Sequence, residues 1–283
     1  MNDIRPQKGP AASSGRPLRE GPAAGSPAVD RALMLLETLA EGDGLTLSEL
    51  GRRLGLAPST VHRLLAALAA RRLAEADPAT QLWGVGPGAF RLGAAFLRRG
   101  GLADRARPVL ARLAEASGET AVLAVADGDA ALVVAEMPGA SSLRAVLPPG
   151  TRLPYHATAP GKALIAHLPL AQVRALLGRA PLPALTPRTL TDQGELTADL
   201  ATLRHGGWLA ERSESATGQN GIAAPVFGGA GDPVAALGLA GPAARLDDAA
   251  LAALGPQLAE AAATLGAALG GPARHLPPAA RGR

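Results

Sequence analysis

The segment from Thr46 to Leu68 constrains the fold more than any other part of the chain, because it contains two short amphipathic helices in close succession. Thr46 precedes Glu49 by three residues, which is the spacing of a capping box. Gly55 suits the end of the first helix, and Pro58 suits the first turn of the second. This pattern predicts a helix-turn-helix whose second helix enters the major groove of DNA.

The second helix separates its apolar residues from its polar ones. Its buried stripe is predicted to comprise Val61, Leu64, Leu65 and Leu68. The candidate DNA contacts are Ser59, Thr60, His62 and Arg63 near the start of this helix, Arg52 and Arg53 on the preceding helix, and Gln81 in the hairpin that follows. Hydroxyl and guanidinium groups bind phosphate oxygens, and arginine also reads guanine edges. The alternative for each of these residues is an ordinary solvated surface.

Composition limits the remaining choices. A chain of 283 residues is long enough for two domains, and with 47% hydrophobic but only 2% aromatic residues its cores must consist of Leu, Ala and Val. The absence of cysteine excludes disulfides, thiolate catalysis and Cys-ligated zinc, and it fits a reducing cytoplasm. We find no signal peptide and no apolar run long enough for a transmembrane helix. A net charge of +4 weakly favours anionic partners.

The N-terminal part of the chain is predicted to be a winged helix-turn-helix domain over residues 28–87. Residues 1–27 are rich in Pro, Gly, Ala and Ser, and we expect a disordered tail there. A helix that begins near Ala28 and ends at Glu41–Gly44 precedes the helix-turn-helix. The strands Leu73–Ala76 and Gln81–Val85 follow it as a wing. A linker helix is predicted over residues 88–101, with the domain boundary at Gly100–Gly101.

The C-terminal part is predicted to be one α+β domain over residues 102–271, followed by a disordered tail over residues 272–283. Asp127-Gly128-Asp129 is typical of a hairpin turn between two β-prone runs. The predicted strands are Thr120–Ala126, Ala130–Met137, Leu143–Leu147, Thr151–Leu153, Trp208–Arg212, Gly221–Phe227 and Val234–Ala240. The predicted helices lie near Val109–Ala116, Pro160–His167, Leu170–Gly178, Glu195–His205 and Asp247–Gly270. We expect a mixed sheet flanked by helices.

No motif in the sequence favours catalysis. Gly161-Lys162 resembles part of a phosphate-binding loop, but Ala163 replaces the hydroxyl residue and His156 replaces the first glycine. There is no nucleophile elbow, the five histidines lack metal-ligand spacing, and no acid pair stands out. We therefore expect neither an enzyme nor a metal or other cofactor. The alternatives to a DNA-binding protein are a winged-helix module for protein interaction and a small-molecule-binding enzyme of unrecognised type.

The chain resembles the IclR family of bacterial transcriptional regulators from about Val29 to Gly271. The matching stretches include VDRALMLLETLA, LSELGRRLGLAPSTVHRLLAAL, LPYHATAPGKALIAHLP, LPALTPRTLTD, GIAAPVF and ALGLAGPAARL, in the family's order and spacing. The resemblance implies a winged helix-turn-helix followed by a GAF-like effector-binding domain. It also implies a cytoplasmic homodimer or homotetramer that binds operator DNA and represses or activates nearby catabolic genes, with repression the preferred reading. Its effectors would be small organic acids or aromatics.

Some effector-site residues carry over from the family and others depart from its pattern. Gly161 matches the glycine of the loop that closes on the ligand, and His156 is a candidate because it precedes that loop. Glu211 stands where an aspartate is common, and Gly221 stands where a cysteine is common. Gly238 and Ala240 replace two serines. Three small, nonpolar replacements are expected to enlarge the cavity, which leads to the hypothesis that the effector is larger or less polar than glyoxylate or pyruvate, or that effector response is lost.

Overall fold

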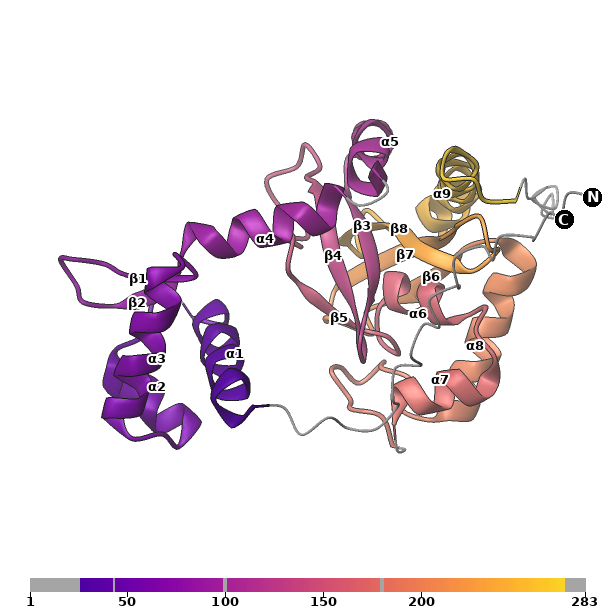
Figure 1. Cartoon of the computed structure of the whole chain (residues 1–283). Coiled ribbons are helices and arrows are strands. Elements are labelled where there is room, and N and C mark those ends of the chain that lie inside the picture. Colours follow the sequence, from indigo (N-terminus) through magenta and orange to yellow (C-terminus); the bar gives the residue numbers. More distant parts are fainter. Residues whose placement is uncertain (1–25, 43, 99–100, 179–180, 273–283) are drawn as a thin grey trace, which may run out of the picture. The chain divides into compact units, whose positions relative to one another are not determined.

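The computed structural model describes residues 26–42, 44–98, 101–178 and 181–272 (Figure 1). Most of the two predicted tails, 1–27 and 272–283, therefore lies outside the described residues. The chain divides into two compact units, Met1–Gly93 and Ala94–Arg283. The division falls inside the segment predicted as a linker helix.

The first unit begins with three helices around a leucine-rich core. They are α1 (Pro27–Ala40), α2 (Leu47–Leu54) and α3 (Pro58–Ala70). The predicted capping box is confirmed, since the Thr46 hydroxyl accepts from the Glu49 amide at 3.2 Å and the Glu49 carboxylate accepts from the Thr46 amide at 2.8 Å. Gly55 has φ +64°, the left-handed geometry that suits glycine after a helix. The buried core residues are Leu35, Leu39, Leu45, Leu50, Val61, Leu65, Leu68 and Ala74.

A two-stranded wing follows the helices, as predicted. Strands β1 (Ala74–Ala76) and β2 (Trp83–Val85) pair antiparallel, and both are shorter than expected. Leu45, which precedes α2, forms a β-bridge with Trp83 through two backbone hydrogen bonds of 3.0 and 2.9 Å. This bridge fastens the base of the wing to the helices. Helix α4 (Pro87–Arg98) then begins close to the predicted position.

The second unit is built on a six-stranded sheet in the order β5-β4-β3-β8-β7-β6. The strands are β3 (Thr120–Asp127), β4 (Ala130–Met137), β5 (Arg152–Pro154), β6 (Leu209–Arg212), β7 (Gln219–Phe227) and β8 (Pro233–Pro242). Every pairing among the described strands is antiparallel, so the expectation of a mixed sheet was wrong. The hairpins β3–β4 and β7–β8 meet through β3 and β8, which places residues 120 and 240 side by side.

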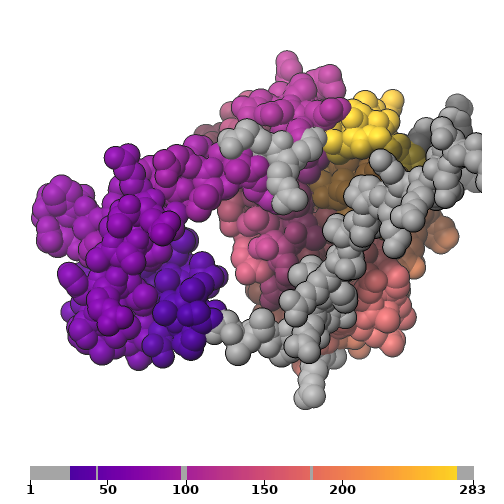
Figure 2. Space-filling view, in the orientation of Figure 1, coloured from indigo at the N-terminus to yellow at the C-terminus, as the bar shows by residue number. Residues whose placement is uncertain are grey.

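Helices cover both faces of this sheet (Figure 1). Helices α5 (Leu102–Ser117) and α9 (Asp248–Ala268) pack on one face and lie next to each other, as Figure 2 also shows. The other face is covered by α6 (Ala159–Ile165), α7 (Leu170–Leu177) and α8 (Gln193–Gly206). Each face has its own core of Leu, Val and Ala, which is consistent with the scarcity of aromatic residues.

The segment 143–147 was predicted to be extended in the sheet, but it does not pair with any described strand. Side chains hold it instead. The Thr120 hydroxyl donates to the Ala145 carbonyl at 2.7 Å, and the Glu136 carboxylate accepts from the Leu147 amide at 2.9 Å. Only the later piece, β5, continues the sheet, where it pairs with the start of β4.

Candidate functional site

The candidate DNA contacts lie on the solvent side of the helix-turn-helix. Val61, Leu65 and Leu68 of α3 are buried in the core of the first unit. On the same helix Ser59, His62 and Arg63 are exposed, whereas Thr60 is half-buried. The sequence therefore leaves the N-terminal end of α3 polar and free to meet a phosphate backbone or base edges.

The remaining DNA candidates lie on neighbouring elements of the same unit. Arg52 and Arg53 are exposed in the last turn of α2. Gln81 is exposed at the turn between β1 and β2 and has φ +58°. Its side-chain amide donates to the Pro78 carbonyl at 3.1 Å, so Gln81 also stabilises the wing's own turn.

The second unit contains a cavity of about 290 Å³ beside the start of α6. Its wall is mostly apolar, with few polar groups, as is usual for a small-molecule site. The lining residues come from distant parts of the chain: Val122, Leu147, Arg152, Leu153, Pro154, Thr158, Ala159, Pro160, Leu185, Glu211, Ser215, Ala216, Gln219, Leu239 and Ala240.

Glu211 is the acidic group of this cavity, and it is only 2% exposed. It lies on β6, and its Oε1 atom accepts from the Glu214 amide at 2.5 Å and from the Ser215 amide at 2.9 Å. The Ser215 hydroxyl lies 3.3 Å from the same oxygen. Burial nevertheless raises the pKa of Glu211 to about 7, because the loss of hydration outweighs these donors.

A buried lysine lies directly behind the cavity wall. Lys162 of α6 is fully buried, and its Nζ atom donates to Asp199 Oδ2 at 2.7 Å and to the two Glu214 carboxylate oxygens at 2.7 and 2.8 Å. Burial raises the pKa of Glu214, although the Lys162 ammonium opposes that shift. Lys162 thus joins α6, α8 and the 213–215 turn. Of these, α6 and the turn contribute residues to the cavity wall.

The loop that precedes α8 is fastened to the same turn. The Thr189 hydroxyl donates to the Glu214 carbonyl at 2.7 Å, and the Thr186 hydroxyl donates to the Ser213 carbonyl at 2.7 Å. Leu185 of this loop contributes to the cavity wall. The loop therefore closes one side of the cavity.

The four small residues predicted at the effector site, Gly161, Gly221, Gly238 and Ala240, lie around the cavity, but only Ala240 lines it. Gly161 packs against the chain before α6, because an added Cβ would lie 2.6 Å from both the Pro154 carbonyl and the Thr158 hydroxyl. Gly221 pairs with Glu211 across β6 and β7 and with Ala240 across β7 and β8. Gly238 lies under Pro160, outside the lining residues.

The two glycines that replace larger residues have close neighbours, and the expected enlargement of the cavity stays a prediction. A Cβ atom at position 238 would lie 2.9 Å from the Pro160 ring and 3.2 Å from Val122. A Cβ atom at position 221 would lie 3.3 Å from Glu211 Oε2. A larger side chain at either position would therefore require the Pro160 ring or the Glu211 carboxylate to move.

The structure separates His156 from Glu211. His156 lines a neighbouring cavity of about 420 Å³ with Tyr155 and Pro183. It is 6% exposed, and its Nε2 atom lies 2.8 Å from the Pro183 carbonyl oxygen. Since Arg152, Pro154 and Leu185 line both cavities, His156 lies behind a shared wall.

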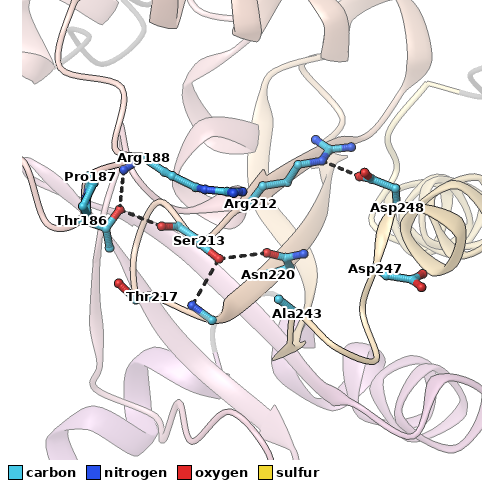
Figure 3. A pocket seen from close by; sticks show the side chains of 11 residues that line it. Thr186, Pro187, Arg188, Arg212, Ser213, Thr217, Asn220, Ala243, Asp247 and Asp248 are labelled. Atoms are coloured by element: carbon cyan, nitrogen blue, oxygen red, sulfur yellow. Dashed lines mark hydrogen bonds and ion pairs between the residues drawn. The ribbon is translucent and has the colours of Figure 1, made fainter.

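A larger pocket of about 510 Å³ lies on the other side of the 211–215 turn (Figure 3). Arg212 and Ser213 line this pocket. Glu211 and Ser215 line the smaller cavity instead. The charged groups of the larger pocket are already partnered in part, since Arg212 Nε donates to Asp248 Oδ1 at 2.7 Å. Asp247 is the N-cap of α9, accepting from the Ala250 amide at 2.9 Å.

The sequence interpretation missed the ion cluster of Lys162, Asp199 and Glu214. One signal was available, since Lys162 is one of only two lysines in a chain rich in arginine. An ammonium is a compact point charge, which suits a buried position between two carboxylates better than the broad guanidinium does. Ser215 and Leu185 were also missed, and nothing in their local sequence marks them.

Two further properties hold for the described part of the chain. No group of three or more His, Asp or Glu side chains there has the geometry to hold a metal ion. No helix in the same residues is both long and apolar enough to cross a bilayer.

Comparison with known proteins identifies both units. Residues 28–78 match the IclR helix-turn-helix domain, and residues 94–267 match the bacterial transcriptional regulator IclR C-terminal domain. The chain is 46% identical to the HTH-type transcriptional regulator BhcR of Paracoccus denitrificans, over 84% of this chain and 85% of that protein. It is 32% identical to the HTH-type transcriptional repressor AllR of Escherichia coli, over 90% and 96% of the two chains.

A solved structure is also similar to this chain. An IclR homologue from Microbacterium hydrocarbonoxydans, crystallised in complex with 4-hydroxybenzoate, superimposes with a TM-score of 0.74 and 25% identity. The match covers 85% of this chain and 99% of that one. From these matches over both units, the chain belongs to the IclR family of bacterial transcriptional regulators.

Proposed function

We propose that this regulator binds operator DNA through α3 and is controlled by a small organic acid bound in the Glu211 cavity. The observation that supports DNA binding is the division of α3 into a buried apolar face and an exposed polar N-terminal end. Ser59, Thr60, His62 and Arg63 contact the operator from α3. Arg52 and Arg53 contact phosphates from α2, and Gln81 does so from the wing.

The proposal for the effector rests on the cavity and on one neighbour. The cavity is small, mostly apolar and lined by one acidic side chain, which suits a compact organic molecule with few polar groups. The neighbour from Microbacterium hydrocarbonoxydans carries 4-hydroxybenzoate, a small aromatic acid. The protein binds such an acid as a signal rather than as a substrate, since its named relatives are regulators.

Regulation is proposed to be repression of nearby catabolic genes in the cytoplasm, by analogy with the relative named as a repressor. The protein would act as a homodimer or homotetramer, since two α3 helices are needed to read two half-sites about 34–36 Å apart. Exposed apolar side chains on α1 and α4 support self-association: Val29, Leu33, Met34, Phe90, Leu92 and Phe96. The proposed bounds are 28–87 for the DNA-binding domain, 88–101 for the linker helix and 102–271 for the effector-binding domain. Effector binding would shift the population of protomer arrangements that match the half-site spacing.

Fluorescence-anisotropy titration of DNA from the gene's own upstream region, against shuffled DNA over a salt series, tests this function. Tight, sequence-selective binding with a steep salt dependence is expected, and glyoxylate, pyruvate or 4-hydroxybenzoate should then weaken it. Equal and weak binding to both DNAs would contradict binding to this operator and would favour a protein-interaction module. A genome-wide pull-down of bound DNA would then separate a distant operator from the absence of any operator.

A further inference from the structure

The side chain of Glu211 faces the cavity with one oxygen already committed. Oε1 accepts the Glu214 and Ser215 amides, which fixes the orientation of the carboxyl group. Within the described residues no hydrogen bond to Oε2 is found, and the atom is not sealed from solvent, since every fully buried side-chain oxygen there has a partner. Glu211 therefore presents one open oxygen to whatever enters the cavity.

The charges around Glu211 do not neutralise it. Lys162 is a buried cation on α6, but its three hydrogen bonds go to Asp199 and Glu214. Arg152 lines the cavity from β5, but its Nη2 atom donates to Asp129 Oδ1 at 2.5 Å and to the Asp127 carbonyl.

Asp199 and Glu214 thus share the ammonium of Lys162, and Glu211 has no ion pair with it. The carboxylate left without an ion partner is the one in the cavity wall. An anionic effector in contact with Glu211 would therefore place its charge beside a nearly buried carboxylate that has no ion partner, which is unfavourable.

Two carboxyl groups in contact at a buried site resolve this conflict by sharing one proton. We propose that the effector acid binds as its anion together with one proton taken up by Glu211, whose Oε2–H then donates to the effector carboxylate. This inference rests on the proposed function, and it makes Glu211 a residue that selects effectors able to accept a hydrogen bond from a neutral acid.

The position of Glu211 makes the required proton available near neutral pH. Burial raises the pKa of Glu211 to about 7, so roughly half of the free protein carries the proton at pH 7. Effectors such as glyoxylate, pyruvate and 4-hydroxybenzoate stay carboxylate anions between pH 6 and pH 8. Any change of affinity across this range therefore arises from the protein.

Calorimetric titration of the full chain with glyoxylate, pyruvate and 4-hydroxybenzoate at pH 6, 7 and 8 tests the proposal. Each titration is run in two buffers of different ionisation enthalpy, which gives the number of protons taken up. For the acid that binds, Kd should rise about tenfold from pH 6 to pH 8 while proton uptake rises from about 0.1 to about 0.9 per site.

Two variants make the result specific to Glu211. Glu211→Gln keeps an acceptor for the two amides and a donor toward the effector, so its Kd should be independent of pH and close to the wild-type value at pH 6. Glu260→Gln, which alters an exposed glutamate on α9, should behave like the wild type.

The possible outcomes distinguish failure of the proton linkage from failure of the proposed effector class. Binding without proton uptake, with affinity that rises with pH, or with unchanged pH dependence in Glu211→Gln overturns the proton linkage alone. Failure of all three acids to bind at any pH contradicts the proposed effector class, and it therefore also contradicts the proton linkage.

Discussion

At the scale of single residues, Arg63 offers a direct test of how this regulator contacts DNA. It is exposed on α3, one turn from the N-terminal end of the helix. Arg63→Ala should weaken operator binding by about 1–3 kcal/mol and relax sequence preference, provided that the guanidinium reads a base. Anisotropy titrations on operator and shuffled DNA measure both effects, with Arg112→Ala on α5 as the control.

The pattern of loss at Arg63 is itself informative. A uniform loss on all sequences with a shallower salt dependence would assign the side chain to a phosphate. Unchanged binding to both DNAs would contradict the placement of α3 against DNA.

Glu211 is also expected to control stability through pH. Its pKa is raised from 4.5 to about 7 on folding, so the folded state holds the proton more tightly than the unfolded state. The stability that this proton provides is complete below pH 4.5 and is lost as the pH rises to about 7. Glu211→Gln should therefore match the wild type in urea denaturation at pH 5 and exceed its unfolding free energy at pH 8 by up to about 3 kcal/mol. Equal stability of the two proteins at pH 8 would rule out a raised pKa.

At the scale of elements, the start of α2 depends on one side chain. The Thr46 hydroxyl accepts the Glu49 amide, and the Glu49 carboxylate bonds back to the Thr46 amide and hydroxyl. Thr46→Ala should cost about 1 kcal/mol of unfolding free energy, whereas Thr46→Ser should retain most of it. Thermal denaturation followed by circular dichroism measures this, and similar losses in both variants would assign the effect to packing instead.

Helices α6 and α8 are held to the cavity wall by charge rather than by apolar contact alone. Lys162→Met leaves the Glu214 and Asp199 carboxylates facing each other without the ammonium, and it should destabilise the second unit by roughly 3–5 kcal/mol. Chemical denaturation at pH 7 measures the loss. The double variant Lys162→Met, Glu214→Leu should recover part of it, and failure to do so would show that the lysine's packing matters more than its charge.

These elements also show what the sequence could and could not predict. The capping box, Gly55 and Pro58 are local signals, so the helix-turn-helix followed from them directly. The pairing of β3 with β8 joins residues more than one hundred positions apart. The contact of Lys162 with Glu214 spans 52 positions. Neither has a local signature, because each depends on how distant elements pack together.

The glycines at 221 and 238 illustrate the same limit in the candidate site. Their small size predicts a larger cavity, but only the structure shows that Glu211 and Pro160 lie close enough to crowd an added Cβ atom there. The volume of a site depends on which neighbours approach it. A sequence alone does not give those neighbours.

At the scale of the whole molecule, the proposed DNA contacts and the proposed effector cavity lie in separate compact units of the chain. The cavity and its ion cluster lie entirely within the second unit. A fragment covering Ala94–Pro272 should therefore fold, bind the effector with an affinity within about threefold of the full chain, and fail to bind DNA. Calorimetry and anisotropy check the two halves of this prediction, and loss of effector binding in a folded fragment would contradict it.

The near absence of aromatic residues gives the protein a practical spectroscopic property. The chain contains only two tryptophans, and the structure places one in each unit. Trp83 bridges the wing to Leu45, whereas Trp208 packs against Gly255 of α9, where a side chain would collide with the indole. Each unit thus carries its own intrinsic fluorophore. Emission from Trp208→Phe reports on the wing as DNA binds, and emission from Trp83→Phe reports on the second unit, so the two events can be timed separately without any attached dye.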